Sequence, residues 1–366
     1  MMSSSICGGE KRSLHFVLKK SNFNGYIWDN MQNTTRHSVQ EVFFDRLKQK
    51  ANPAISFVDE IAEVLELSND SAYRRLRGET AITLEEAIKL AGHFGIGLDE
   101  FTSTKSDMVM FGRSTFREKP EDFFTYLQKT AERFGAIAAM REKKGIYAAK
   151  DIPTFSYFQV PEFAEFKLYY WLRTVRGNTL IQDEKFNFGL VPEDLIKKSR
   201  AIAKYYFQIP FTELWSEDTV NVALRQIEYF HEAGWMQSSE VAVRVCDALE
   251  QIIRGVQKQA ETELMWFDGK PVHPDVPYAL YFNDIAVMDN AIFVQTDKFA
   301  ISMIGYNAMD YLYTQHPGFC RETENFLKKQ ISRSVLISGA AEKERNKFFN
   351  KIYSKIAALK TRIQSS

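Results

Sequence analysis

Short amphipathic segments follow one another along the chain from Ser38 onward. Apolar residues recur in them at the three-to-four-residue spacing of helices, and each segment is bounded by a capping or stop signal. Ser38 and Thr83 each stand three residues before a glutamate, the sequence of a capping box, and Gly78 and Gly95 stand where helices end. The pattern predicts five short helices in residues 36–102 that bury a small core of their own.

The remainder of the chain is mostly helical in pattern. The pattern in residues 103–119 predicts a linker. Apolar residues then recur at helical spacing through most of residues 120–366. Three short β-type runs at about 277–305, parted by MDN and TDK, predict hairpin strands. We therefore expect a mainly α protein, in which a five-helix N-terminal domain precedes a mostly helical C-terminal region with a small antiparallel β-sheet. Residues 1–35 lack clear periodicity and predict a disordered leader or a gene start placed too early.

Composition and charge narrow the class of protein. The chain of 366 residues is 45% hydrophobic and 14% aromatic, which suffices for a large core, and its formal net charge is zero. A basic partner site would therefore be local. Three cysteines far apart favour a reducing compartment, and neither a secretory signal nor an apolar run of roughly 20 residues is evident in the sequence. We expect a cytoplasmic protein of two or three domains with no membrane partner.

A helix–turn–helix pattern begins at Ala62. This small residue suits the close crossing of two helices, and Leu67 supplies an apolar residue in the turn that follows. Ser68 can cap the second helix by accepting a hydrogen bond from its free amides. Ala72 and Leu76, four residues apart, form the apolar seam of that helix.

This arrangement resembles the lambda-repressor/Cro-like (XRE-type) helix-turn-helix regulators. The segments AYRRLRGE, AITLEEA and GLDEF, with FCRETENFLKKQISRSVLIS and EKERNKFF near the C-terminus, are similar to a bacterial subgroup with a long C-terminal region. The resemblance implies a transcriptional regulator that binds double-stranded DNA with its second helix in the major groove. Two positions depart from the family: Glu66 stands where glycine is common, and Arg75 where an apolar residue is preferred. Glu66 must adopt a left-handed backbone or a different turn.

The exposed positions of the second helix, residues 69–77, supply the candidate DNA contacts. In this geometry the start of the helix enters the major groove, whereas neighbouring positions lie over phosphates. Asparagine suits adenine, and arginine suits guanine. The residues expected at base edges are Asn69, Asp70, Ser71 and Arg74. The residues expected at phosphates, or as caps beside them, are Ser68, Tyr73, Arg75, Arg77, Thr80 and Thr83.

The net charge of this domain opposes the prediction. Residues 36–101 contain eight Lys/Arg and twelve Asp/Glu, so their net charge is −4 (8 − 12). The acids gather on the helix before the turn, and it is the sign of the contacting face that governs DNA binding. An acidic domain predicts modest affinity for one copy, and we therefore expect a homodimer on two half-sites. The alternative is a protein-interaction module, such as a signalling adaptor or an antitoxin-like protein.

The C-terminal region carries no catalytic motif that we can identify. It has no Gly-rich phosphate loop, nucleophile elbow, HExxH or CxxC, and no two of the six histidines stand at metal-ligand spacing. We expect no catalytic residue, metal or cofactor; an enzyme with a fused regulatory domain is a third alternative. A sensory role for a small-molecule or peptide effector is favoured, although the aromatic residues that could line a pocket also suit a core.

The last helix, expected at about 341–362, has three interpretations. Phe349, Ile352, Ile356 and Leu359 recur on one stripe, with lysines on the other faces. The stripe can pack on its own domain, form a dimer seam, or leave a basic face for phosphates.

Overall fold

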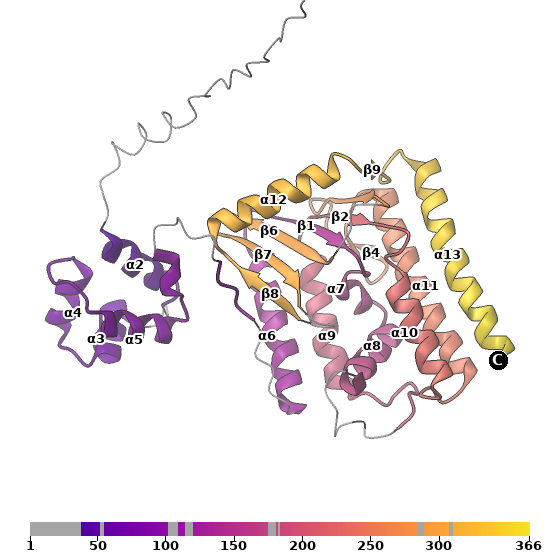
Figure 1. Cartoon of the computed structure of the whole chain (residues 1–366), viewed down its shortest axis with the longest axis horizontal. Helices are drawn as coiled ribbons and strands as arrows, with labels where there is room; N and C mark the ends of the chain where they lie inside the picture. Colours follow the sequence, from indigo (N-terminus) through magenta and orange to yellow (C-terminus); the bar gives the residue numbers. More distant parts are fainter. Residues whose placement is uncertain are drawn as a thin grey trace, which may run out of the picture. The chain divides into compact units, whose positions relative to one another are not determined.

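The computed structural model describes residues 38–51, 55–101, 109–113, 120–174, 181, 184–284, 289–306 and 310–366. The chain divides by its internal contacts into two compact units, Met1–Thr104 and Lys105–Ser366 (Figure 1). Each unit buries a hydrophobic cluster of its own. The leader expected at residues 1–35 lies outside the described residues.

The described residues of the N-terminal unit form four α-helices and one 3-10 turn, where we expected five helices. They are α2 (Val39–Lys48), α3 (Phe57–Leu65), α4 (Asn69–Leu76), α5 (Leu84–Phe94) and η1 (Leu98–Phe101). Both predicted capping boxes are confirmed. The hydroxyls of Ser38 and Thr83 accept from the amides of Glu41 and Glu86, whose carboxylates accept from the cap amides in return. The unit's first and fourth helices therefore begin where local sequence places them.

The C-terminal unit is built on a seven-stranded mixed sheet, so the expected mainly α class with a small antiparallel sheet is wrong. The strand order is β8-β7-β6-β1-β2-β5-β9. The pairs β1–β2 and β2–β5 are parallel, and the other pairs are antiparallel. The strands are β1 (Lys143–Ala149), β2 (Phe211–Trp215), β5 (Tyr278–Phe282), β6 (Ala291–Thr296), β7 (Ala300–Gly305), β8 (Tyr311–Thr314) and β9 (Val335–Leu336), beside a separate ribbon of β3 (Trp266–Phe267) and β4 (Lys270–Pro271).

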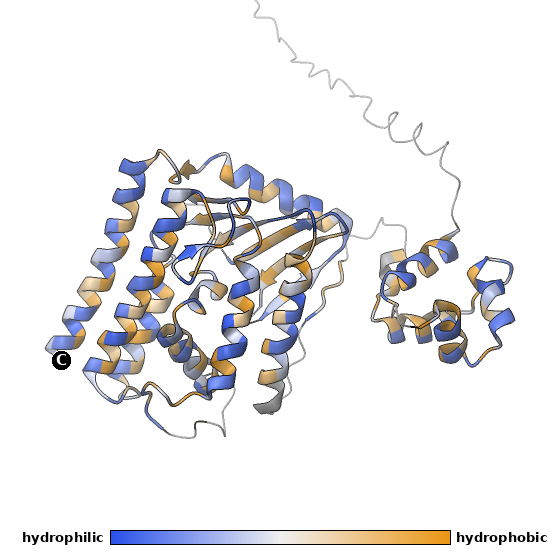
Figure 2. Cartoon of the chain, turned by 180° about the vertical axis from the view of Figure 1, so that it is seen from behind, coloured by the Kyte–Doolittle hydropathy of each residue, from blue (hydrophilic) through white to orange (hydrophobic). Residues whose placement is uncertain are grey.

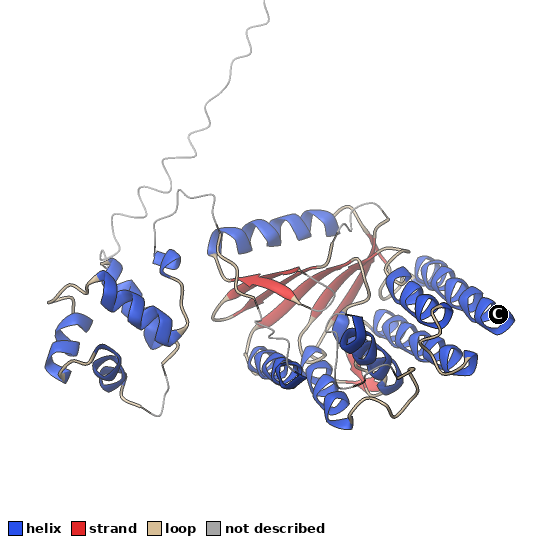
Figure 3. Ribbon diagram, turned by 60° about the horizontal axis from the view of Figure 1, so that its bottom comes forward, coloured by secondary structure: helices blue, strands red, loops and turns tan. Residues whose placement is uncertain are grey.

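Helical connections join the parallel strands. Between β1 and β2 run α7 (Thr154–Tyr157), α8 (Pro161–Thr174) and α9 (Glu193–Tyr206), and between β2 and β5 run α10 (Asn221–Glu232) and α11 (Ser239–Thr262). The remaining helices are α6 (Pro120–Ala138), α12 (Pro317–Ile331) and α13 (Glu342–Ser365). Figure 3 shows α12 on one face of the sheet and the connecting helices on the other.

The hairpin predicted across TDK is confirmed, whereas the one predicted across MDN is wrong. β6 and β7 pair antiparallel through residues 297–299. β5 instead pairs with β2 and β9, and β6 pairs with β1. The short helix α7 lies within the segment TFSYFQV.

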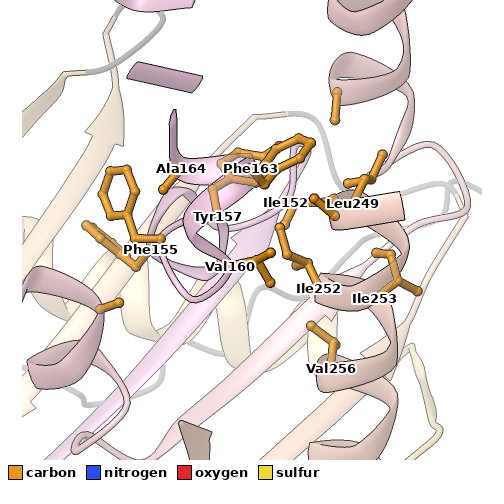
Figure 4. Packing of buried hydrophobic residues seen from close by; sticks show 14 of the residues in the cluster. Ile152, Phe155, Tyr157, Val160, Phe163, Ala164, Leu249, Ile252, Ile253 and Val256 are labelled. Atoms are coloured by element: carbon orange, nitrogen blue, oxygen red, sulfur yellow. The ribbon is translucent and has the colours of Figure 1, made fainter. Parts of the chain in front are cut away.

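The main core lies between the sheet and the connecting helices. Ile152, Phe155 and Val160, around α7, face Leu249 and Ile252 of α11 (Figure 4). In Figure 2 the central strands are largely hydrophobic, while α13 alternates between hydrophobic and hydrophilic residues. No helix in the described part of the chain has the length and apolar character needed to cross a bilayer.

The core also encloses a carboxylate. Glu213 of β2 is buried and accepts hydrogen bonds from the Tyr206 hydroxyl at 2.7 Å, the Tyr278 hydroxyl at 2.8 Å and the Trp215 indole at 2.8 Å. Burial raises the pKa of Glu213 above its ordinary value, although the three hydrogen bonds oppose this shift. The donors come from α9, β2 and β5, so this carboxylate ties three elements together.

The apolar stripe of α13 packs on its own unit, as the first of our three interpretations proposed. Phe349, Ile352, Ile356 and Leu359 are all fully buried, and the helix contacts α10 and α11. Its cations pair with those helices: Lys360 contacts Asp247 at 2.5 Å and Glu250 at 2.7 Å, and Arg362 contacts Glu228 at 2.7 Å.

Residues 109–113, which we expected within the linker 103–119, lie along β8. The amide of Gly112 donates to the Tyr313 carbonyl at 2.7 Å, and the Tyr313 amide donates back at 2.9 Å. A Cβ at Gly112 would lie 2.6 Å from the Tyr313 ring, so glycine permits this close approach.

Candidate nucleic-acid interface

The predicted helix–turn–helix pattern corresponds to α3, a tight turn and α4. Glu66 ends α3 in the left-handed conformation, with φ 57° and ψ 43°. The Leu67 amide then donates to the Ala62 carbonyl at 2.9 Å. Ala62 and Ala72 are both buried. The glutamate therefore takes the conformation that the family's glycine would supply, at a cost of roughly 1–2 kcal/mol.

The first residues of α4 hold the turn together. The Ser68 hydroxyl caps the helix by accepting from the Ser71 amide at 3.4 Å, and it donates to the Ser71 hydroxyl at 3.0 Å. The Asn69 amide group donates to the carboxylate of Asp59 on α3 at 2.8 Å. These three polar side chains thus have partners within the unit, and reading a base would require them to exchange those partners.

Asp70 and Arg74 extend into solvent from the same face of α4. Their side chains are 82% and 62% exposed, and they form an i,i+4 ion pair at 3.5 Å. Arg77, one turn further, lies 3.6 Å from Glu79, and its guanidinium is 5.6 Å from the ring centre of Tyr73. Exposed pairs of this kind contribute only about 0–1 kcal/mol, so a phosphate or a base can replace the carboxylate.

Arg75 has a different environment from the one we expected. Its Nε and Nη2 donate to the two carboxylate oxygens of Glu86 on α5, at 3.0 and 2.8 Å, and its Nη1 donates to the Ser71 carbonyl. Both side chains are mostly buried, with 16% and 17% exposed. The hydrogen bond from Arg75 lowers the pKa of Glu86. The expected phosphate contact by Arg75 therefore does not fit, because the guanidinium already clamps α4 to α5.

Thr80 and Thr83 lie in the connection between α4 and α5. The Thr80 amide donates to the Arg74 carbonyl at 3.2 Å. The Thr83 hydroxyl is occupied as the cap of α5, where it accepts from the Glu86 amide at 3.2 Å. Thr83 is exposed and Thr80 is half-buried. Both residues therefore stabilise the connection and also border the exposed face of α4.

Gln40 on α2, which no motif in the sequence singled out, holds the connection between α4 and α5. Its Nε2 donates to the carbonyls of Arg75 at 2.7 Å and Thr80 at 2.8 Å, and its Oε1 accepts from the Ile82 amide at 3.0 Å. One side chain thus satisfies three backbone groups of the connection. No spacing in the local sequence identifies Gln40. The Arg75–Glu86 pair, in contrast, could have been predicted, because Arg75 stands at a position where the helix-turn-helix pattern prefers an apolar residue.

The comparisons with known proteins add no relative: no family model, no curated protein and no solved structure matches this chain. Within the residues that the structure describes, no group of His, Cys, Asp and Glu side chains is arranged to hold a metal ion. The interface is therefore characterised by its own geometry alone.

Proposed function

We propose that the chain is a sequence-specific DNA-binding transcriptional regulator that places α4 in the major groove. The observation that carries the proposal is one exposed face of α4 and its C-cap, which holds Asp70, Tyr73, Arg74 and Arg77. They stand at i, i+3, i+4 and i+7, the spacing of a single helix face. Behind this face, Ala72 is buried and Arg75 is clamped to Glu86.

Each side chain of this face suits a defined contact. Arg74 can donate to both acceptors of a guanine edge once Asp70 releases it, and Asp70 can accept from the amino group of cytosine. Arg77 and Tyr73 suit a phosphate and the sugar beside it. A good bidentate base contact contributes about 1–3 kcal/mol of discrimination.

The charge of the unit limits the affinity of one copy. Every arginine of α4 and its C-cap has a carboxylate partner: Asp70 for Arg74, Glu86 for Arg75 and Glu79 for Arg77. Phosphates must compete with two of these carboxylates, so binding of one copy is weak. We therefore include in the proposal a homodimer on two half-sites, with the C-terminal unit as the dimerisation or effector part.

Selection from a pool of random duplexes tests this proposal. The full chain at low salt is expected to enrich a common sequence, and a labelled duplex of that sequence is expected to bind with an affinity that falls as salt rises. If no sequence is enriched and no duplex binds at low salt, the proposal is wrong.

A protein partner is the second candidate, because the same unit exposes large apolar side chains. Val39 and Val42 on α2 and Leu84 and Ile88 on α5 are all exposed. Large apolar side chains that stay exposed are often found at protein interfaces when they gather in a patch. A chain that binds no duplex, yet loses a protein partner on Ile88→Asp, would support this candidate over the first.

A further inference from the structure

The face of the sheet that carries α12 contains a groove. Cys320 and Leu327 of α12 pack on Ala148 of β1 and Phe293 of β6, so the helix is fixed over that part of the sheet. Beside it, between α12 and the amino-terminal ends of β1, β2 and β5, lies a half-open cavity of about 640 Å³. Figure 3 shows α12 above this face of the strands. Cavities of roughly 300–1,000 Å³ suit small organic ligands.

The lining of the groove is mainly apolar and aromatic. Ile146, Tyr281, Phe293 and Ile331 form much of it, with the Thr212 hydroxyl among them. Phe293 is buried, whereas Ile146, Tyr281 and Ile331 are only partly covered. Apolar surface of three elements is thus left accessible in a concave site, which is the arrangement that favours a ligand with a flat apolar body.

The two lysines that line the groove differ in their ion-pair partners. On the α12 side Lys328 pairs with Glu324 at 2.7 Å. Lys144 shares a sheet face with Ile146, two residues on, and it has no carboxylate within ion-pair distance among the described residues. In the described part of the chain, one ammonium group therefore lines an apolar groove without a counter-ion.

A carboxylate stands at the opposite end. Glu263 lines the groove beside Pro277, and its carbonyl accepts from the Tyr278 amide at 2.9 Å. β1 and β5 flank β2, and the segment of Glu263 pairs with β5 on the side away from β2. The backbones at Lys144 and Glu263 are therefore separated by about three strand spacings, roughly 14 Å. The groove therefore attracts an anion at its β1 end and repels one at its β5 end.

We propose that this groove binds a small amphipathic organic acid with a single acidic group. The acid pairs with Lys144, and an aromatic or branched apolar body lies over Ile146, Tyr281 and Phe293. Glu263 excludes ligands that carry a second acid at the far end. This site is independent of the DNA-binding proposal, since it lies wholly within the C-terminal unit.

Three related probes test the site: biphenyl carboxylate, its neutral carboxamide and the biphenyl dicarboxylate with an acid at each end. Binding to the full chain is followed by nuclear magnetic resonance of isoleucine methyl groups. The monocarboxylate is expected to shift the Ile146 and Ile331 methyl signals and to bind at least about tenfold more tightly than the other two, since a tenfold ratio corresponds to one ion pair of about 1.4 kcal/mol.

Exposed-residue variants identify the charges responsible. Lys144→Gln is expected to reduce monocarboxylate binding to that of the carboxamide, and Glu263→Gln is expected to admit the dicarboxylate. Lys329→Gln, an exposed lysine elsewhere on α12, is the matched control and should change nothing. The proposal is overturned if the Ile146 and Ile331 signals do not move, or if Lys144→Gln has no more effect than Lys329→Gln.

Discussion

Glu66 holds a left-handed backbone that glycine adopts at lower cost. We expect Glu66→Gly to stabilise the α3–α4 turn by about 1 kcal/mol, because the strain of a side chain at φ 57° is relieved. Amide hydrogen exchange of peptides covering α3 and α4 in the full chain would measure this as slower exchange. The matched control is Glu63→Gly, three residues earlier and inside the helix, which is expected to speed exchange because glycine costs about 1 kcal/mol there. Faster exchange in Glu66→Gly would contradict the account.

Arg75 stabilises the fold of the N-terminal unit and does not contact phosphate in our account. We expect Arg75→Met to destabilise the α4–α5 connection by about 1.5–3 kcal/mol, because Glu86 loses a two-bond charged partner. Adding Glu86→Gln, which keeps the capping box, should recover much of the loss. The measurement is again hydrogen exchange over α4 and α5.

Arg77 gives the contrasting result. Arg77→Ala is expected to leave that exchange unchanged, since its pair with Glu79 is exposed. It should instead lower the slope of DNA affinity against salt by about one unit. If Arg75→Met, in a fully folded state, lowered the salt slope as Arg77→Ala does, the assignment of the two arginines would be wrong.

Lys167 makes the stability of the C-terminal unit depend on pH. It is buried, its Nζ donates to Gln226 at 2.8 Å and lies 4.4 Å from the Tyr157 ring centre, and burial lowers its pKa to about 8. The facing groups are Asp151, whose charge opposes the shift, and the rings of Tyr170 and Trp171. Between pH 8 and the ordinary value of 10.5, the unfolded chain binds more protons than the folded chain, so this residue favours folding increasingly as pH rises.

The matching variant is Lys167→Met, which removes the titrating group. Relative to this variant, the wild-type chain is expected to gain about 2 kcal/mol of unfolding free energy between roughly pH 7 and pH 9.5. Urea unfolding followed by tryptophan fluorescence at the two pH values measures the difference. If the difference in unfolding free energy between the wild-type chain and the variant is the same at both pH values, the lowered pKa of Lys167 is refuted.

Part of the candidate site could be predicted from sequence. The spacing of Ala62, Ser68 and Ala72 predicted the turn and the seam of α4, because small and capping residues act over a few positions. The partners of Asn69 and Arg75 could not be predicted, since Asp59 and Glu86 are brought to them by the packing of α3 and α5. Asn69 and Arg75 were expected to contact DNA, and both instead have partners that come from other helices of the unit.

At the scale of elements, helices with caps were predictable and the central strands were not. α10 and α11 carry an apolar stripe with a period that local sequence displays. β2 has five residues, with four buried and a glutamate among them. A parallel strand covered on both faces lacks the alternation that identifies an exposed strand. Its partners, β1 and β5, lie more than sixty residues away in sequence, and so the sheet could not be assembled from local patterns.

The packing of α13 gives a prediction at the same scale. Ile352 is fully buried against its own unit, so Ile352→Ala is expected to destabilise the C-terminal unit by about 2–5 kcal/mol. It should leave the molar mass in solution unchanged, measured by light scattering on folded protein. The exposed Lys347→Ala on the same helix is the control and should change neither quantity. A change in oligomeric state on Ile352→Ala with unaltered stability would favour a dimer seam instead.

At the scale of the whole molecule, the two units carry separate proposals. The N-terminal unit presents an exposed face on α4, which we propose binds DNA, and the C-terminal unit holds a groove beside α12, which we propose binds a small acid. The acidic balance of the first unit makes the identity of each exposed residue on α4 important, because net charge supplies little attraction to DNA. Specific base contacts must then account for a large part of the binding.

The most direct test compares the sequences that the wild-type chain and Arg74→Ala select from random duplexes. We predict that the wild-type chain enriches a motif with guanine at one position of each half-site, and that Arg74→Ala loses the preference at that position while other positions are kept. Arg141→Ala, an exposed arginine in the C-terminal unit, should select the wild-type motif. An Arg74→Ala chain that selects the same motif with the same preference would contradict the placement of α4 in the major groove.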